Sequence, residues 1–132
     1  MTLVIIVSIV SSSPLGYIQM NTQSPCPFCL IAATYLPTDP ETLTCPDPTL
    51  LTPNCHLILS TPSVMAFLDI MPMTAGHVLV IPRVHREKLG DLVGHEGASL
   101  GQWLPIVSRA VMKALGRAGG DWNVVQNNGI TY

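Results

Sequence analysis

The chain is poor in charge, and no Lys or Arg precedes Arg83. Charged residues make up 11% of its 132 residues and aromatic residues 5%, and the net charge is −2. Because ordinary soluble domains have roughly 25% charged residues, we expect an apolar surface. A nucleic-acid polymer requires a dense basic face on its partner, so this class of ligand is not expected. The basic residues are Arg83, Arg86, Lys88, Arg109, Lys113 and Arg117.

Cysteine is also scarce, and no apolar run is long enough to cross a membrane. Four cysteines at uneven spacing do not suggest a disulfide scaffold, so we expect a reducing compartment, the cytoplasm or the nucleus. The apolar run Leu3–Val10 is much shorter than the roughly 20 residues of a transmembrane helix. Membrane insertion is therefore not expected.

This N-terminal run allows several interpretations. A signal peptide, and with it secretion, is disfavoured because no Lys or Arg precedes the run. The alternatives are a tail, an added strand, or translation from an upstream start, since Met20 stands just before the first motif. We predict residues 1–24 as a tail and residues 25–132 as one domain.

The periodicity of the remaining residues predicts an α+β fold. A short helix is expected at residues 30–35, and a proline-rich loop at residues 37–53. Apolar residues at helical spacing predict one main helix from about Ser99 to Leu115, in which Pro105 either causes a kink or lies in the first turn. Gly116 can supply a left-handed cap. Short apolar runs predict an antiparallel sheet of about four strands, at residues 57–60, 64–68, 77–81 and 122–126.

The last predicted strand is followed by a hairpin signal. Asn128-Gly129 tolerates the positive φ angles of a tight turn, and such a turn leads into a returning strand. Only residues 130–132 follow it. We therefore expect a domain that is incomplete at its C-terminus and has about four of five strands.

Several motifs together resemble the histidine triad (HIT) family of nucleotide hydrolases and transferases. They are Cys26-Pro27-Phe28-Cys29, Phe67-Leu68-Asp69-Ile70, Gly76-His77-Val78-Leu79-Val80-Ile81-Pro82 with His85, and Gln126-Asn127-Asn128-Gly129. The resemblance covers about residues 55–129 and implies an antiparallel sheet of about five strands with one main helix. It also implies a purine nucleotide as ligand and a homodimer as a possible assembly.

The resemblance assigns nucleotide contacts to four residues. Asp69 would accept hydrogen bonds from the two ribose hydroxyls, as a carboxylate can. Ile70 would pack on the base or sugar, and Asn127 would position phosphate or ribose oxygens. His77 would correspond to the first family histidine, which supports the reacting imidazole. Taken singly, these residues also fit a turn carboxylate, a core isoleucine and a strand histidine.

The reacting group itself is missing from this sequence. In the family, the middle imidazole of a His-x-His-x-His run attacks the α-phosphorus and forms a nucleotidyl-histidine. The four histidines here, His56, His77, His85 and His95, are never two residues apart. We therefore expect a nucleotide-binding relative of phosphoramide- or dinucleotide-cleaving enzymes without turnover. A non-catalytic interaction module or an incomplete gene product is the alternative.

Cys26, Cys29 and His85 match the structural zinc ligands of some family members. Thiolates and imidazole suit zinc, but a closed structural site takes four ligands, and the family's fourth is a histidine in the absent segment. Cys45, Cys55 or His56 could substitute, and a pair of reduced thiols without zinc is an equal alternative. A third interpretation of the C-x-x-C spacing is a glutaredoxin-like redox motif, although the rest of the chain does not follow that fold.

Overall fold

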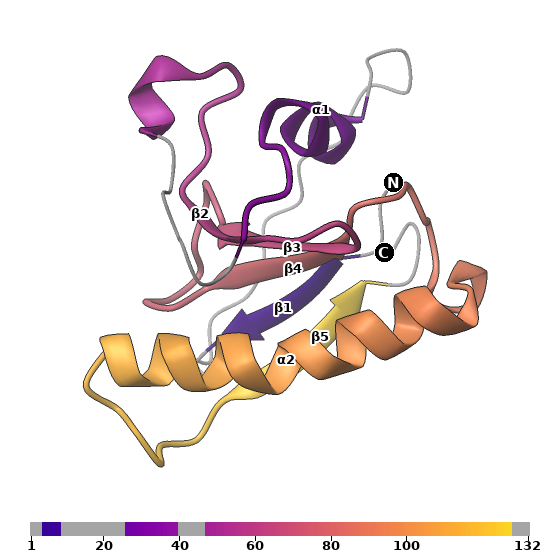
Figure 1. The fold of residues 1–132 in the computed structure, drawn as a ribbon. Coiled ribbons are helices and arrows are strands. Elements are labelled where there is room, and N and C mark those ends of the chain that lie inside the picture. The colour runs from indigo at the N-terminus through magenta and orange to yellow at the C-terminus, as the bar shows by residue number, and fades with distance from the viewer. Residues whose placement is uncertain (1–3, 9–25, 40–46, 128–132) are drawn as a thin grey trace.

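The computed structural model describes residues 4–8, 26–39 and 47–127, and it consists of one sheet with a helix on each face (Figure 1). The longer helix, α2, packs against β3 and β4. The elements in chain order are β1 Val4–Ser8, α1 Pro27–Thr34, the 3-10 helix Pro48–Leu50, β2 Leu57–Ser60, β3 Val64–Leu68, β4 Val78–Pro82, the 3-10 helix Leu89–Asp91, α2 Gly94–Ala114 and β5 Asn123–Asn127.

The sheet has five strands in the order β2-β3-β4-β1-β5, and every neighbouring pair is antiparallel. The α+β prediction is confirmed, and the four predicted strands are present within one residue of their expected bounds. A βαβ unit would pair parallel strands, as the glutaredoxin interpretation requires. The described sheet has no such pair.

The fifth strand comes from the apolar N-terminal run. β1 lies between β4 and β5, with Ile6 opposite Leu79 on one side and Val125 on the other. Residues 4–8 are therefore not part of a tail, as predicted, but form the added strand that was the alternative interpretation. The rest of the predicted tail, apart from these residues, lies outside the described residues, as does the Asn128-Gly129 turn.

β3 and β4 are buried on both faces, which explains their unbroken apolar sequences. Successive side chains of a strand point to opposite faces, so each strand contributes to two cores. One core joins Val64, Ala66, Val78 and Val80 to the apolar stripe of α2. The other joins Met65, Phe67, Leu79 and Ile81 to Tyr35 and to Phe28, Ile31 and Ala32 of α1.

Both helices begin earlier than predicted. α1 starts at Pro27, whose fixed φ suits the first helical position, whereas the apolar pattern indicated Leu30. α2 starts at Gly94 rather than Ser99, because its first turn is held by a polar contact: the Glu96 carboxylate accepts the Val93 N–H at 3.0 Å. Apolar periodicity cannot reveal such a turn.

The structure decides the place of Pro105 in α2 and confirms the predicted cap at Gly116. Pro105 lies inside the helix rather than in its first turn. Gly116 has a φ of 67°, so it supplies the predicted left-handed cap, and the Arg117 N–H donates to the Met112 carbonyl as in a Schellman motif. No helix in the described ranges combines the length and hydropathy that crossing a bilayer requires.

Candidate functional site

The connection between β3 and β4 holds Asp69 and His77 at its two ends. The Asp69 N–H donates to the His77 carbonyl at 3.2 Å, and the His77 N–H donates to the Thr74 carbonyl at 3.2 Å. These bonds close the turn at its base and bring the two side chains together. Rigid strands on both sides therefore fix the spacing of an acid and an imidazole.

Gly76 allows this turn to lie directly against α2. Its φ is 81°, a conformation that side chains with a Cβ rarely adopt. A Cβ at this position would also lie 2.6 Å from Cδ1 of Leu115 and 3.0 Å from Cγ1 of Val111. The backbone conformation thus favours glycine, and a larger residue would in addition have to displace the ends of the Leu115 and Val111 side chains.

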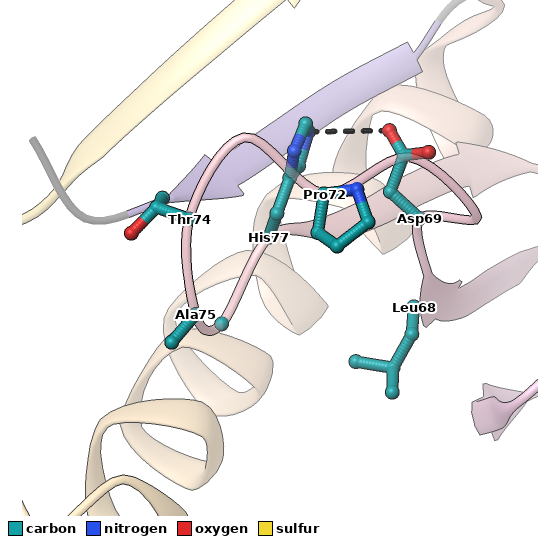
Figure 2. A pocket seen from close by; sticks show the side chains of 7 residues that line it. Leu68, Asp69, Pro72, Thr74, Ala75 and His77 are labelled. Carbon is teal, nitrogen blue, oxygen red and sulfur yellow. Dashed lines mark ion pairs between the residues drawn. The ribbon is translucent and has the colours of Figure 1, made fainter. Parts of the chain in front are cut away.

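Hydrogen bonds from the turn backbone orient the side chains of Asp69 and His77. The Met71 N–H donates to Oδ1 of Asp69 at 2.8 Å, and the Met73 N–H donates to Nδ1 of His77 at 3.1 Å. Because Nδ1 accepts, a neutral His77 carries its proton on Nε2. Nε2 lies 3.4 Å from Oδ2 of Asp69 and makes no hydrogen bond within the described part of the chain. Figure 2 shows the two side chains pointing toward one another.

Burial decides the charge of His77. Its side chain is 3% exposed, and this loss of solvent lowers the pKa of His77 below its ordinary value, although the charge of Asp69 opposes the effect. The imidazole is therefore neutral near pH 7. It presents a buried Nε2–H donor beside a carboxylate acceptor.

A pocket of about 330 Å³ opens beside this pair (Figure 2). Small-molecule pockets range from roughly 300 to 1,000 Å³ and combine apolar walls with a few polar groups. Asp69 and His77 supply two of the polar groups here. The full lining is Leu68, Asp69, Pro72, Thr74, Ala75, Gly76 and His77.

Ile70 and Asn127 lie outside the lining of this pocket. Ile70 follows Asp69 and is 89% exposed, so it is an apolar surface beside the site rather than a core residue. Asn127 pairs with Val4, whereas Val78, next to His77, pairs with Val7. Val4 and Val7 are three residues apart, so at about 3.3 Å per residue Asn127 lies about 10 Å from the level of Val78 along the strands, and two strands away from it. The structure does not bring it to Asp69 and His77.

Cys26, Cys29 and His85 meet at the start of α1, on the face of the sheet opposite to α2. Cys26 caps the start of α1, Cys29 lies in its first turn, and His85 follows the end of β4. Their ligand atoms lie within 4.8 Å of one another, and Sγ of Cys29 is 3.3 Å from Nδ1 of His85. Zinc bonds to sulfur and nitrogen measure about 2.3 and 2.1 Å, so one ion fits between these atoms.

The described residues add no fourth His, Cys, Asp or Glu to this Cys–His cluster. Cys55, one of the proposed substitutes, lies in the core, and burial raises the pKa of its thiol to about 11. A thiol that stays protonated is a poor zinc ligand. His56 is not part of the cluster, and Cys45 lies outside the described residues.

Sequence reasoning did not identify the backbone of the 70–76 turn as part of the site. The N–H groups of Met71 and Met73 orient the two functional side chains, and Pro72, Thr74 and Ala75 form the pocket wall. The only sequence signal for this turn was the Pro72 and Gly76 pair, which marks a turn without showing what it holds.

Comparison with known proteins identifies the family of this chain. The model of the HIT domain matches residues 52–131. The chain belongs to the HIT family. The part of the HIT domain that the structure describes contains the Asp69–His77 pair, β2 to β5 and α2.

Relatives in this family include named enzymes. An adenosine 5'-monophosphoramidase of Schizosaccharomyces pombe is 41% identical over 57% of this chain and 52% of its own length. An adenosine 5'-monophosphoramidase of Saccharomyces cerevisiae is 39% identical over 54% of this chain and 42% of its own. An adenylylsulfatase of Arabidopsis thaliana is 32% identical over 49% of this chain and 32% of its own length. The chain spans about half the length, or less, of the curated relatives it matches.

Proposed function

We propose that this HIT domain binds a purine nucleotide at the pocket beside Asp69 and His77, and that the 132-residue polypeptide does not cleave it. The observation that supports this most is the pairing of an available carboxylate oxygen with a buried imidazole N–H at an apolar pocket. The names of the relatives, which specify adenosine-derived substrates, support the choice of ligand class.

The chemistry of each group fits a nucleoside. Oδ1 of Asp69 is engaged by the turn backbone, whereas Oδ2, 3.4 Å from Nε2 of His77, keeps lone pairs that can accept from ribose hydroxyls. Ile70 gives the base or sugar an apolar surface, and covering such a side chain contributes up to about 1.5–3 kcal/mol. Asn127 would act on phosphate oxygens at a separate point along the sheet.

The proposed lack of turnover follows from the state of the histidines. A nucleophilic imidazole needs a free lone pair, but Nδ1 of His77 accepts the Met73 N–H and Nε2 carries the proton. His85 belongs to the Cys–His cluster, and His56 and His95 do not line the pocket. His77 is therefore a positioning group here.

A calorimetric titration with adenosine monophosphate tests the binding. We expect saturable binding by the wild type and at least a tenfold loss in Asp69→Ala. Asp121→Ala, an exposed acid outside the pocket, is the matched control and should bind as the wild type does. No binding at millimolar ligand would contradict the proposal. Hydrolysis of an adenosine phosphoramidate by this polypeptide, above the rate of a His77→Asn variant, would contradict the lack of turnover.

We also propose that Cys26, Cys29 and His85 hold a structural zinc ion. The three ligand atoms fit one ion, and water or a residue outside the described ranges would complete its coordination. When bound, zinc supplies no chemistry to the nucleotide pocket, which lies at a different part of the fold; it ties α1 to the segment after β4. Elemental analysis should find about one zinc per chain, and Cys29→Ser should lose it.

The interaction-module alternative is supported by the open edges of the sheet. Among the described strands, β2 and β5 each have one edge without a strand partner, and such edges invite pairing with another chain. A homodimer formed through either edge would fit the family expectation. Light scattering at several concentrations tests this, and a monomer throughout would contradict it.

The cytoplasm or nucleus remains the expected compartment.

A further inference from the structure

Arg83 makes an unusual set of hydrogen bonds at the end of β4. Its Nε donates to the Thr61 carbonyl at 2.9 Å, and its Nη1 donates to the carbonyls of Ala32 at 2.7 Å and Tyr35 at 3.1 Å. Its Nη2 donates to the Tyr35 carbonyl at 3.1 Å and to Oγ of Ser60. All these acceptors are neutral oxygens, so no carboxylate pairs with the guanidinium in this set. Burial lowers the pKa of the Arg83 guanidinium.

These bonds connect the two segments that carry the Cys–His cluster. Ala32 and the C-cap residue Tyr35 lie at the end of α1, the helix that has Cys26 as its N-cap and Cys29 in its first turn. Along the chain, Arg83 stands two residues before His85. One guanidinium therefore bonds to the C-terminal end of α1 from a position two residues before the imidazole. The hydroxyl of Ser60 strengthens this link, since its one proton is shared between the carbonyls of Tyr35 and Leu36.

Beyond its C-terminal end, where the buried Tyr35 accepts the Cys55 N–H at 2.8 Å through its hydroxyl, α1 makes few apolar contacts. None of its residues is buried, and only Phe28, Ile31 and Ala32 pack partly against the core beneath it. The position of such a helix depends on the bonds at its C-terminal end, three of which come from Arg83, so it can shift when they are removed. A metal site does not tolerate this, because its bond lengths are fixed to within about 0.2 Å.

We propose that Arg83 is a positioning residue for the metal site: it holds α1 so that the Cys29 thiolate and the His85 imidazole reach the same ion. This inference rests on the proposed zinc site. Groups that orient metal ligands typically change affinity by about 10- to 100-fold when they are removed. A lysine can replace the fork only in part, because its ammonium donates from a single point and not in a plane.

Binding of Co²⁺ tests the proposal, because a thiolate-bound cobalt ion gives a charge-transfer absorption and tetrahedral cobalt gives visible bands. We expect Arg83→Met to weaken Co²⁺ binding by about 10- to 100-fold and Arg83→Lys to weaken it less. Ser60→Ala, which removes one acceptor of the fork, should also weaken binding. These milder variants give the answer if Arg83→Met does not fold.

Two controls separate positioning from general stability. Arg109→Met removes an exposed guanidinium from α2, on the other face of the sheet, and should leave Co²⁺ affinity unchanged. Val107→Ala weakens the core under α2 without touching α1, so it should lower the melting temperature but not the affinity.

The outcomes distinguish this inference from the zinc proposal. If the wild type shows no thiolate–cobalt absorption, the zinc site is wrong and the role of Arg83 is wrong with it. If the wild type binds but the Arg83 and Ser60 variants bind equally tightly, only the role of Arg83 is overturned. A loss of affinity in Val107→Ala equal to that in Arg83→Met would overturn it as well.

Discussion

At the scale of single residues, the buried neutral His77 gives folding a specific pH dependence. Burial lowers the pKa of His77 from its ordinary value of 6.5, so between the folded and the ordinary pKa the unfolded chain binds more protons than the folded one. The free energy of unfolding contributed by this group therefore rises with pH across that window and falls on acidification. Urea unfolding at a series of pH values below 7.5 measures it.

The control for this prediction is His77→Asn. Asparagine keeps an acceptor for the Met73 N–H but does not titrate. The variant should show a smaller rise of unfolding free energy with pH than the wild type. Parallel curves for the two proteins would show that the pKa of His77 does not differ between the folded and unfolded states.

Gly76 and Gly101 provide a matched pair of glycine substitutions with opposite expected signs. Gly76→Ala should lower the free energy of unfolding by more than about 1 kcal/mol, because the φ is positive and Leu115 occupies the space. Gly101→Ala, inside α2 with no atom near its Cβ position, should raise it by about 0.5–1 kcal/mol. Chemical denaturation measures both. Equal and small effects would refute the close packing of the turn on α2.

Asp69 shows how far residue-level reading of the sequence can go. Asp69 can act both as a turn residue and as a ligand contact, because its two oxygens differ. Oδ1 accepts the Met71 N–H, and Oδ2 faces His77. The sequence could predict both roles but not their division. The position of Asn127 depends on strand register, which its motif does not contain.

At the scale of the elements, β1 is the strand that connects β5 to the rest of the sheet. Among the described strands, β5 pairs only with β1, and β1 also pairs with β4. Ile6→Pro should disrupt the pairing of this central strand, since proline removes a ladder N–H and its ring does not fit the middle of a sheet. We expect amides of β5 to lose protection in hydrogen exchange, whereas β2 and β3 keep theirs. Ile6→Val, which keeps the N–H, is the control, and unchanged protection of β5 in Ile6→Pro would contradict this topology.

The strands could be predicted because local composition specifies them, but their order could not. The bounds of β3 and β4 follow from branched apolar runs between turn residues. Placing Val4–Ser8 between β4 and β5 is a contact between residues distant in sequence, and no local pattern encodes it. The start of α2 was missed for the related reason that its first turn is set by the carboxylate of Glu96 and not by apolar spacing.

At the scale of the whole molecule, the proposed zinc ion would join two segments that lie 56 residues apart in the sequence, at Cys29 and His85. A ligand that binds only the folded state adds stability by mass action, about 2.7 kcal/mol when its free concentration is one hundred times its dissociation constant. The zinc-loaded protein should therefore melt at a higher temperature than the same protein in EDTA. Cys29→Ser should melt at one temperature in both buffers, because it has lost a ligand. If EDTA leaves the wild-type melting temperature unchanged, the core under α1, built on Met65, Phe67 and Ile81, is stable without a metal and the cysteines are ordinary thiols.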